Sequence, residues 1–221
     1  TRAPEPTTIA LFGSGIFGML ITFARRAYAL TKRALDVTLS IIAVIILAPV
    51  CVGVALLIKL TSKGPVLFTQ TRVGKDGKLF NIFKFRTMRV DAEKETGAVW
   101  AAENDPRLIP IGKFLRKAHL DEIPQFINVL RGEMSIIGPR PERPNFVELF
   151  KQQITDYEKR LEVKPGITGL AQVWHRYDEN IEDVRKKIKY DILYIKNICL
   201  WTDMQILLRT VKVVVTGEGA R

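Results

Sequence analysis

A run of 22 residues without a charged side chain, Val37–Ile58, limits the folds that are open to this chain. A helix of about 20 apolar residues spans the hydrocarbon core of a bilayer, so the run predicts a membrane helix. Pro49 lies just past its middle, where the missing N–H and the ring favour a kink. Two topologies follow: a helix that crosses the membrane, or a re-entrant helix-break-helix that enters one leaflet and returns.

The charges on either side of the run bear on this choice. Basic residues both precede and follow it: Arg25, Arg26, Lys32, Arg33, Lys59 and Lys63. A crossing helix normally has its excess of positive charge on one side. The symmetric charge favours two ends on the cytoplasmic face, and an ordinary crossing helix remains an equal alternative. A shorter apolar segment, 9–24, is interrupted by glycines and predicts an interfacial helix or the end of a preceding membrane region.

The composition indicates an anionic partner. The 221 residues suit one domain, and 34 Lys and Arg against 23 Asp and Glu give a net charge of +11. Two cysteines and two histidines, without metal or redox spacing, argue against a disulfide framework, a zinc site or a Ser-His triad. No helix-turn-helix or RNP-like motif accompanies the basic charge. Phosphates, nucleotides and acidic lipid are therefore favoured over nucleic acid.

A basic β-hairpin is predicted after the apolar run. Residues 66–73 and 78–85 have strand-like composition and are joined by Gly74–Gly77. Alternation places Lys84 and Arg86 on one face of the second strand, where two neighbouring cations suit a phosphate. A solvated hairpin face is the alternative.

The acid pair Asp121-Glu122 lies near mid-chain, just before Pro124. Pro124 is predicted to start a short helix that runs to about Leu130 and ends at Gly132. The N-terminus of a helix stabilises anions, by about 0.3–1 kcal/mol each when they are exposed. The pair is therefore either a nucleophile with an assisting acid at a divalent cation, or only a helix cap.

The segment Gly138–Pro144 contains three prolines and two arginines, Arg140 and Arg143. Its proline density excludes regular helix and central strand. A stiff backbone that carries arginines lowers the entropic cost of clamping a phosphate, which the guanidinium fork matches in shape. The alternative is a structural loop with exposed arginines.

Helices are predicted for 145–162, 180–194 and 202–215. The last one is basic and amphipathic, so it lies either on the membrane surface or against the core. Before the second helix, Trp174–Tyr177 forms a polar-aromatic cluster that includes Arg176 and suits contact with a sugar or a base. Together with the hairpin, these elements predict a helix-dominated α+β fold with amphipathic surface helices.

Six short motifs, in this order, resemble those of one family. They are Lys32–Asp36, Lys63–Phe68, Phe83–Met88, Leu120–Gln125, Ser135–Pro141 and Pro165–Gly169. From about Lys32 to its end the chain resembles the bacterial sugar transferases, the monotopic polyprenol-phosphate phosphoglycosyl transferases. The Glu142–Pro144 extension and the Gly217–Arg221 end are most similar to the larger, exopolysaccharide-type members.

The resemblance implies a reaction and a membrane arrangement. Members transfer a sugar 1-phosphate from a nucleotide diphosphosugar to undecaprenyl phosphate, release UMP, form a covalent aspartyl intermediate and require Mg²⁺. Their re-entrant helix holds them in one leaflet of the bacterial inner (cytoplasmic) membrane, with the active site on the cytoplasmic face. For this chain we expect a UDP-hexose donor in exopolysaccharide or other glycoconjugate assembly. A homo-oligomer is left open.

The resemblance also divides the chain. Residues 32–221 correspond to the catalytic domain, with a re-entrant helix at about 36–60 that is broken at Pro49. Residues 1–31 form a lead segment, expected to be the end of a preceding membrane region because larger members carry membrane helices and a further domain. A start at Thr1 rather than Met fits such a fragment.

The resemblance, together with the basic segments described above, implies the candidate site. Asp121 is the expected nucleophile, and Asp121 and Glu122 are the expected Mg²⁺ ligands. Substrate or phosphate contacts are expected from six basic residues: Lys84, Arg86, Arg116, Arg140, Arg143 and Arg176. The chain departs from the family pattern at Ala48, His119 and Trp174–Arg176, and the last departure leaves the sugar open.

Two other functions would use the same features. A membrane-associated hydrolase of nucleotide sugars or lipid diphosphates needs the same acids, magnesium and arginines. A non-enzymatic adaptor that binds anionic lipid needs no catalytic aspartate, so Asp121→Asn would leave its function intact. The nucleotide product and its dependence on lipid separate these alternatives from phosphoglycosyl transfer.

Overall fold

The structure, a computed structural model, describes residues 6–94, 97, 105–174 and 181–216. The chain divides into two compact units, Thr1–Leu35 and Asp36–Arg221. Helix α1 (Pro6–Thr61) begins in the first unit and continues into the second. The remaining helices and strands, and the described residues of the candidate site, belong to the second unit.

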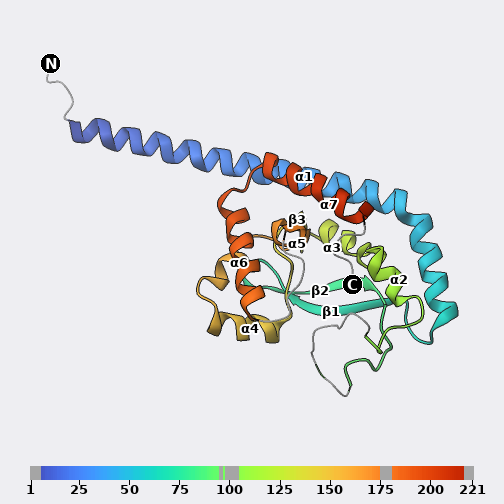
Figure 1. Cartoon of the computed structure of the whole chain (residues 1–221). Coiled ribbons are helices and arrows are strands. Elements are labelled where there is room, and N and C mark those ends of the chain that lie inside the picture. The colour runs from blue at the N-terminus through green and yellow to red at the C-terminus, as the bar shows by residue number, and fades with distance from the viewer. Residues whose placement is uncertain (1–5, 95–96, 98–104, 175–180, 217–221) are drawn as a thin grey trace. The chain divides into compact units, whose positions relative to one another are not determined.

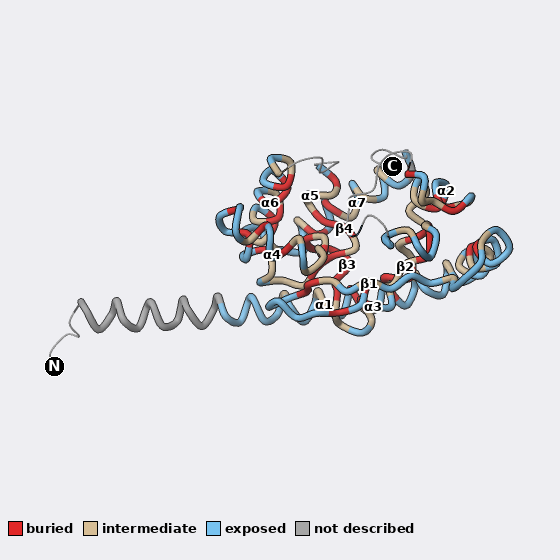
Figure 2. The backbone as a smooth tube through the Cα atoms, turned by 90° about the horizontal axis from the view of Figure 1, so that it is seen from below, coloured by how far each residue is buried: buried red, intermediate tan, exposed pale blue. Residues whose placement is uncertain are grey.

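Within α1, Thr22–Thr61 is long and apolar enough to cross a membrane, judged by length and composition. Most of its side chains are exposed, as the pale blue tube of α1 in Figure 2 shows. Large apolar residues such as Ile45, Ile46 and Leu56 are among them. The exposed apolar side chains of the uncharged part, Val37–Ile58, suit contact with lipid, which agrees with the predicted membrane element.

The helix is continuous through Pro49. Figure 1 shows that the ribbon of α1 bends within its Asp36–Thr61 part. Proline lacks the N–H of one helical hydrogen bond and its ring displaces the carbonyl four residues earlier, which bends a helix while the neighbouring bonds persist. Pro49 lies inside α1, and the predicted re-entrant break at this residue stays a prediction.

Strands β1 (Leu67–Val73) and β2 (Leu79–Phe85) form the predicted antiparallel hairpin. A 3₁₀ turn, Lys75–Gly77, connects them, and Asp76 and Gly77 adopt positive φ angles of 55° and 76°. In Figures 1 and 2 the hairpin lies between α4 and α6 on one side and α2 on the other. Strand β2 is the one that contacts α3 and the turn that carries the acid pair.

The rest of the second unit is mainly helical. Its elements are α2 (Gly112–Lys117), η2 (Leu120–Glu122), α3 (Gln125–Arg131), β3 (Ser135–Ile137), α4 (Pro144–Gln153), η3 (Tyr157–Glu162), β4 (Gly166–Thr168), α5 (Leu170–Trp174), α6 (Ile181–Lys196) and α7 (Leu200–Thr216). Strands β3 and β4 pair in parallel. The predicted helices 180–194 and 202–215 are confirmed as α6 and α7, and the whole is the helix-dominated α+β fold that the sequence predicts.

The predicted helix 145–162 is wrong in its extent. Helix α4 ends at Gln153, and the separate 3₁₀ helix η3 follows. Asp156, between them, has a φ of 65°, a left-handed conformation through which an α-helix does not continue. Both pieces contribute to one apolar cluster, so the spacing of apolar residues could not reveal the interruption.

Clusters of buried apolar side chains fix the elements that carry the site. One joins β2, α3, β3 and α7 through residues that include Ile82, Val129 and Ile206. Another joins the C-terminal part of α1 to the end of β2 and to Leu115 of α2. Burying one side chain of this kind contributes roughly 1.5–3 kcal/mol. The acid pair lies in the short connection between α2 and α3, so both of its ends are anchored.

Candidate active site

The acid pair lies in the 3₁₀ turn η2, between α2 and α3. His119 enters this turn with a φ of 55°, and Pro124 leads into α3. Gly132, with a φ of 81°, ends α3 as predicted. The tight turn gives the two adjacent carboxylates different surroundings, because successive side chains of a 3₁₀ turn point in different directions.

Glu122 binds two cations. Lys84 Nζ lies 2.6 Å from Glu122 Oε1, and Arg140 Nη2 lies 2.6 Å from the same oxygen. Arg140 Nη1 donates to Oε2 at 3.4 Å. Burial alone would raise the pKa of Glu122, but Arg140 and Lys84 hold it well below its usual range. The contacts join the hairpin, the acid pair and the proline-rich segment at one carboxylate.

Asp121 differs from Glu122 in its contacts. Its side chain is buried, with a relative exposure of 8%, and no group among the described residues donates a hydrogen bond to its carboxylate. Burial raises its pKa, and Lys84 acts in the opposite direction. A carboxylate that lies among positive charges but accepts no hydrogen bond can bind or attack another group through its oxygens.

Arg116 belongs to the same electrostatic environment. Its Nε donates to Thr87 Oγ1 at 3.0 Å, which fixes the guanidinium beside the loop that follows β2. Burial lowers its pKa, and Asp121 is the acid that most opposes this shift. Lys84 behaves similarly, since burial lowers its pKa against the effect of Glu122. The predicted residues Lys84, Arg116 and Arg140 therefore surround the acid pair.

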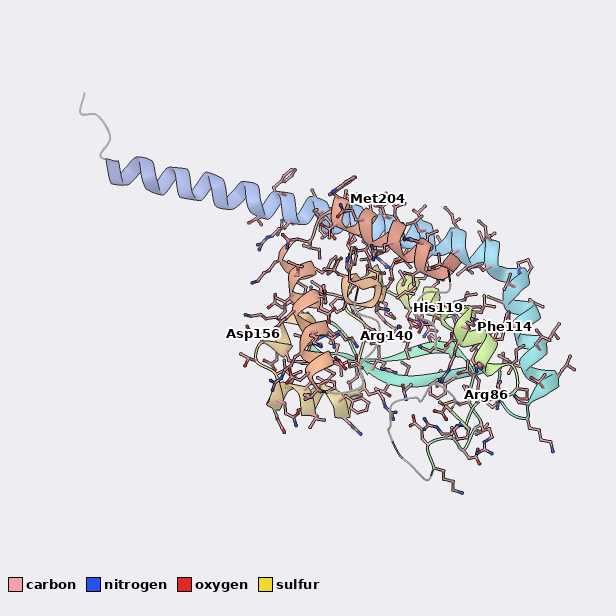
Figure 3. The ribbon with its side chains drawn as sticks, in the orientation of Figure 1. Arg86, Phe114, His119, Arg140, Asp156 and Met204 are labelled. Atoms are coloured by element: carbon pink, nitrogen blue, oxygen red, sulfur yellow. The ribbon has the colours of Figure 1, made fainter. Side chains whose placement is uncertain are left out.

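Two other predicted cations lie elsewhere. Arg86 donates to the carbonyl of Lys63 at 2.6 Å and to Ser62 Oγ at 2.7 Å, at the end of α1. Figure 3 shows Arg86 well apart from Arg140. Arg143 pairs with Glu93 through both guanidinium arms, at 2.7 and 2.9 Å. Arg176 lies outside the described residues.

Comparisons with known proteins identify the family of this chain. The family model described as bacterial sugar transferase matches residues 27–217. The chain belongs to the bacterial sugar transferase family. A second model, described as a PEP-CTERM protein-sorting motif, matches residues 2–26, within the first unit.

Several relatives of this sugar transferase chain are named for their reactions. The UDP-N-acetylgalactosamine-undecaprenyl-phosphate N-acetylgalactosaminephosphotransferase of Aeromonas hydrophila is 47% identical over 194 residues, 88% of this chain and 46% of that protein. The UDP-glucose:undecaprenyl-phosphate glucose-1-phosphate transferase of Klebsiella pneumoniae is 42% identical over 205 residues, 92% and 42% of the two chains. The chain thus spans less than half the length of these relatives.

A further relative is covered almost completely. The exopolysaccharide production protein PSS of Rhizobium leguminosarum bv. phaseoli is 41% identical over 194 residues, which are 85% of this chain and 97% of that protein. A sequence of about this length therefore exists as a whole protein in the family. The relatives' names also differ in the sugar that they specify.

The acid pair can be tested as a Mg²⁺ site. The part of the chain that the structure describes holds no group of three or more His, Cys, Asp or Glu residues arranged for a metal ion. Magnesium in phosphate-transferring sites is commonly held by one or two carboxylates together with substrate phosphates and water. Asp121 fits that pattern because its carboxylate accepts no hydrogen bond from the described residues, whereas Glu122 would reach an ion only by sharing its oxygens with Lys84 and Arg140.

The charged residues that contact the segment of Arg140 were not predicted from the sequence. Arg160 and Asp191 form a buried ion pair at 2.9 Å, and Lys187 lies 2.9 Å from Glu142. These partners are 31 and 45 residues apart in the chain, so no local pattern joins them. In the sequence, only the acidic residue Glu142, directly after the second proline of the segment, indicated that further charged residues lie against this segment.

Proposed function

We propose that this chain transfers a sugar 1-phosphate from a UDP-sugar to undecaprenyl phosphate and releases UMP, with Asp121 as the nucleophile. The observation that carries the proposal is the contrast within the acid pair. Glu122 holds Lys84 and Arg140, while the buried Asp121 carboxylate is left without a hydrogen bond from the described residues. The relatives' names, which specify undecaprenyl-phosphate sugar phosphotransfer, support the same reaction.

The transfer takes place in two displacements at one phosphorus. A carboxylate oxygen of Asp121 attacks the phosphorus next to the sugar, an O–P bond forms, and the bond to UMP breaks with its electron pair on UMP. A phosphate oxygen of undecaprenyl phosphate then attacks the aspartyl phosphosugar, and the Asp121 carboxylate leaves. The lipid diphosphosugar is the product, and the aspartate is regenerated.

The surrounding cations supply most of the catalysis, since phosphoryl transfer requires alignment and charge neutralisation above all. Lys84 and Arg140 would contact the diphosphate oxygens while Glu122 keeps both side chains in place. Arg116, fixed by Thr87, adds positive charge beside Asp121. A bound Mg²⁺ would supply further neutralisation of the diphosphate, with Asp121 and Glu122 as its protein ligands.

The membrane arrangement belongs to the proposal. We infer that Asp36–Thr61, bent in the region of Pro49, enters and leaves one leaflet of the cytoplasmic membrane as a re-entrant helix. The active site then faces the cytoplasm at the depth of the lipid phosphate, which brings the acceptor close to Asp121. Apolar residues exposed on α7, including Trp201, Leu208 and Val211, would lie at the same interface. The product would begin exopolysaccharide or other glycoconjugate assembly.

The nucleotide product tests the proposal. The detergent-solubilised chain is incubated with Mg²⁺, undecaprenyl phosphate and a panel of UDP-hexoses and UDP-N-acetylhexosamines, and the nucleotide is identified. We expect UMP together with a lipid diphosphosugar for at least one donor. UDP would indicate ordinary glycosyl transfer and refute the proposal. UMP released equally fast without lipid would identify a hydrolase instead.

A further inference from the structure

The segment Pro139–Glu142 carries the Arg140 side chain that contacts Glu122. Each of its four backbone carbonyls accepts a hydrogen bond. The four donors come from four places: Gly166 N to Pro139 O at 2.9 Å, Arg160 Nη2 to Arg140 O at 2.8 Å, Arg72 Nη1 to Pro141 O at 3.0 Å, and Val73 N to Glu142 O at 3.0 Å. Two of these donors are backbone groups and two are arginine side chains. The arginine side chains donate to the two central carbonyls, those of Arg140 and Pro141.

The prolines explain why side chains are needed. Pro139 and Pro141 have no N–H, so this segment cannot pair with a neighbour as a regular strand. A buried carbonyl that lost its donor would destabilise the fold. Arg160 and Arg72 supply the donors that a strand ladder would otherwise provide, from elements far away in the sequence.

Arg160 is itself held in one orientation. It is 4% exposed, and its Nε and Nη2 lie 3.0 and 2.9 Å from Asp191 Oδ2. Its Nη1 donates to Tyr157 Oη at 2.9 Å. With these contacts and the carbonyl of Arg140, all three nitrogens of the guanidinium are used. A planar guanidinium whose three nitrogens all form contacts has little freedom to move. It therefore fixes the positions of the groups that it contacts.

Arg72 holds the neighbouring carbonyl from the hairpin. Its Nη2 donates to Gln70 Oε1 at 2.7 Å, and its Nη1 lies 3.8 Å from Glu142 Oε2. Glu142 in turn binds Lys187 of α6 at 2.9 Å. The segment is therefore fixed from β1 on one side and from η3 and α6 on the other.

We propose that Arg160 and Arg72 are positioning residues for the transfer. They fix the carbonyls of Arg140 and Pro141, and through them the place at which the Arg140 guanidinium meets Glu122 and the substrate phosphate. The inference rests on the proposed function, because it assigns to Arg140 a contact with the reacting diphosphate. It predicts that loosening this segment lowers the rate of transfer rather than only the stability of the fold.

A double-mutant cycle tests the proposal in the full chain. Arg160→Lys keeps a charge for Asp191 but has a single nitrogen in place of the fork. We expect kcat to fall about 10- to 100-fold, the range for a small misplacement of a catalytic group, with a smaller change in KM. In an Arg140→Lys background the same substitution should lower kcat by no more than about threefold, because the two residues act through one contact.

Val184→Ala is the matched control for stability. Val184 is buried in the apolar cluster that also contains Tyr157, and it makes none of the contacts to the proline-rich segment described above. We expect it to lower the melting temperature while kcat stays within about twofold of the unsubstituted chain. An equal loss of rate for Arg160→Lys in both backgrounds would overturn the proposal, as would a folded Arg160→Lys chain with unchanged kcat. If Arg160→Lys does not fold, Arg72→Lys is taken through the same cycle, with the same criteria.

A second measurement needs no substrate. Hydrogen exchange of the Gly166 and Val73 amides, which donate to the carbonyls of Pro139 and Glu142, should be faster in Arg160→Lys and in Arg72→Lys than in Val184→Ala at equal global stability. Unchanged exchange in both arginine variants would refute the positioning role. If the unsubstituted chain forms no UMP, the proposed function fails, while the exchange data still decide whether these arginines hold the segment.

Discussion

The two adjacent carboxylates of this site differ in their contacts. Glu122 neutralises Lys84 and Arg140, and its pKa is held well below the usual range. Asp121 is buried without a hydrogen bond from the described residues, and its pKa is raised. A pair whose environments separate their pKa values in this way is typical of groups with separate chemical roles.

Asp121→Asn tests the role of nucleophile directly. The amide nitrogen and oxygen cannot form the phosphosugar ester, so we expect no sugar-phosphate mass adduct on the protein and a loss of transfer of at least about 10³-fold. Intact-protein mass spectrometry after incubation with the UDP-sugar and Mg²⁺ detects the adduct. Asp76→Asn, in the exposed hairpin turn, is the control and should behave like the unsubstituted chain. An adduct that persists in Asp121→Asn would place the nucleophile elsewhere.

The pH dependence of adduct formation follows from the raised pKa of Asp121. Only the ionised carboxylate attacks, so the single-turnover rate should fall as pH drops through a pKa above the ordinary aspartate value of 3.8. The negative charge of Glu122 contributes to that raised pKa. We therefore expect Glu122→Gln to shift the acidic limb of the rate profile to lower pH, whatever its effect on the maximum rate. A shift to higher pH would contradict this assignment of charges.

At the scale of elements, the site depends on short pieces that are anchored elsewhere. The turn η2 is placed by α2 and α3, and Lys84 lies near the end of β2. Arg86, two residues later, instead joins the hairpin to the end of α1 through Ser62 and Lys63. Strand β2 thus contributes a cation to the site, and the residue directly after it is a cation that contacts the C-terminal end of α1.

The topology of α1 is tested by labelling its two flanks. Cys51 and Cys199 are replaced by serine, and single cysteines are introduced by Ala34→Cys or Lys63→Cys. The re-entrant arrangement predicts that an impermeant maleimide reaches both positions in inside-out vesicles and neither in intact cells. Labelling from opposite sides would show a crossing helix. A detergent-lysed sample, in which both cysteines must react, is the control.

At the scale of the whole molecule, a buried charge network supports the second unit. Burial would raise the pKa of Glu142, but Lys187, Arg160 and Arg72 lower it to about 2. Asp191 and Arg160 continue the network into α6 and η3. A buried ion pair adds little compared with an apolar pair of the same shape, but removing one partner is costly. The network therefore specifies the arrangement of β1, the proline-rich segment and α6.

Glu142→Gln should show this dependence in the free energy of unfolding. The folded-state pKa of Glu142 is below its ordinary value of 4.5, so its contribution is complete above about pH 4.5 and is lost as pH falls towards 2. We expect Glu142→Gln to lower stability by about 3 kcal/mol at pH 7 and to weaken the loss of stability between pH 4.5 and 2. Denaturant unfolding across this pH range measures both effects. Glu158→Gln, which removes an exposed acid that pairs with Lys151, is the control and should change little.

The local elements and the candidate chemical groups of this chain can be predicted from its sequence alone. The length of the apolar run predicts the membrane helix, and period-two spacing predicts the hairpin. Pro124 and Gly132 predict the limits of α3. These predictions succeed because each element depends on residues that are neighbours in the chain. The motifs around Asp121, Lys84 and Arg140 indicated the family and its candidate site. Which of the two acids forms ion pairs, and which accepts no hydrogen bond from the described residues, depends on the tertiary structure. It also assigned Arg86 to α1 and Arg143 to Glu93, and showed how Arg72 and Arg160 fasten the segment of Arg140. Those outcomes depend on contacts between residues tens of positions apart, and burial and hydrogen bonding at such contacts are set by packing rather than by local pattern.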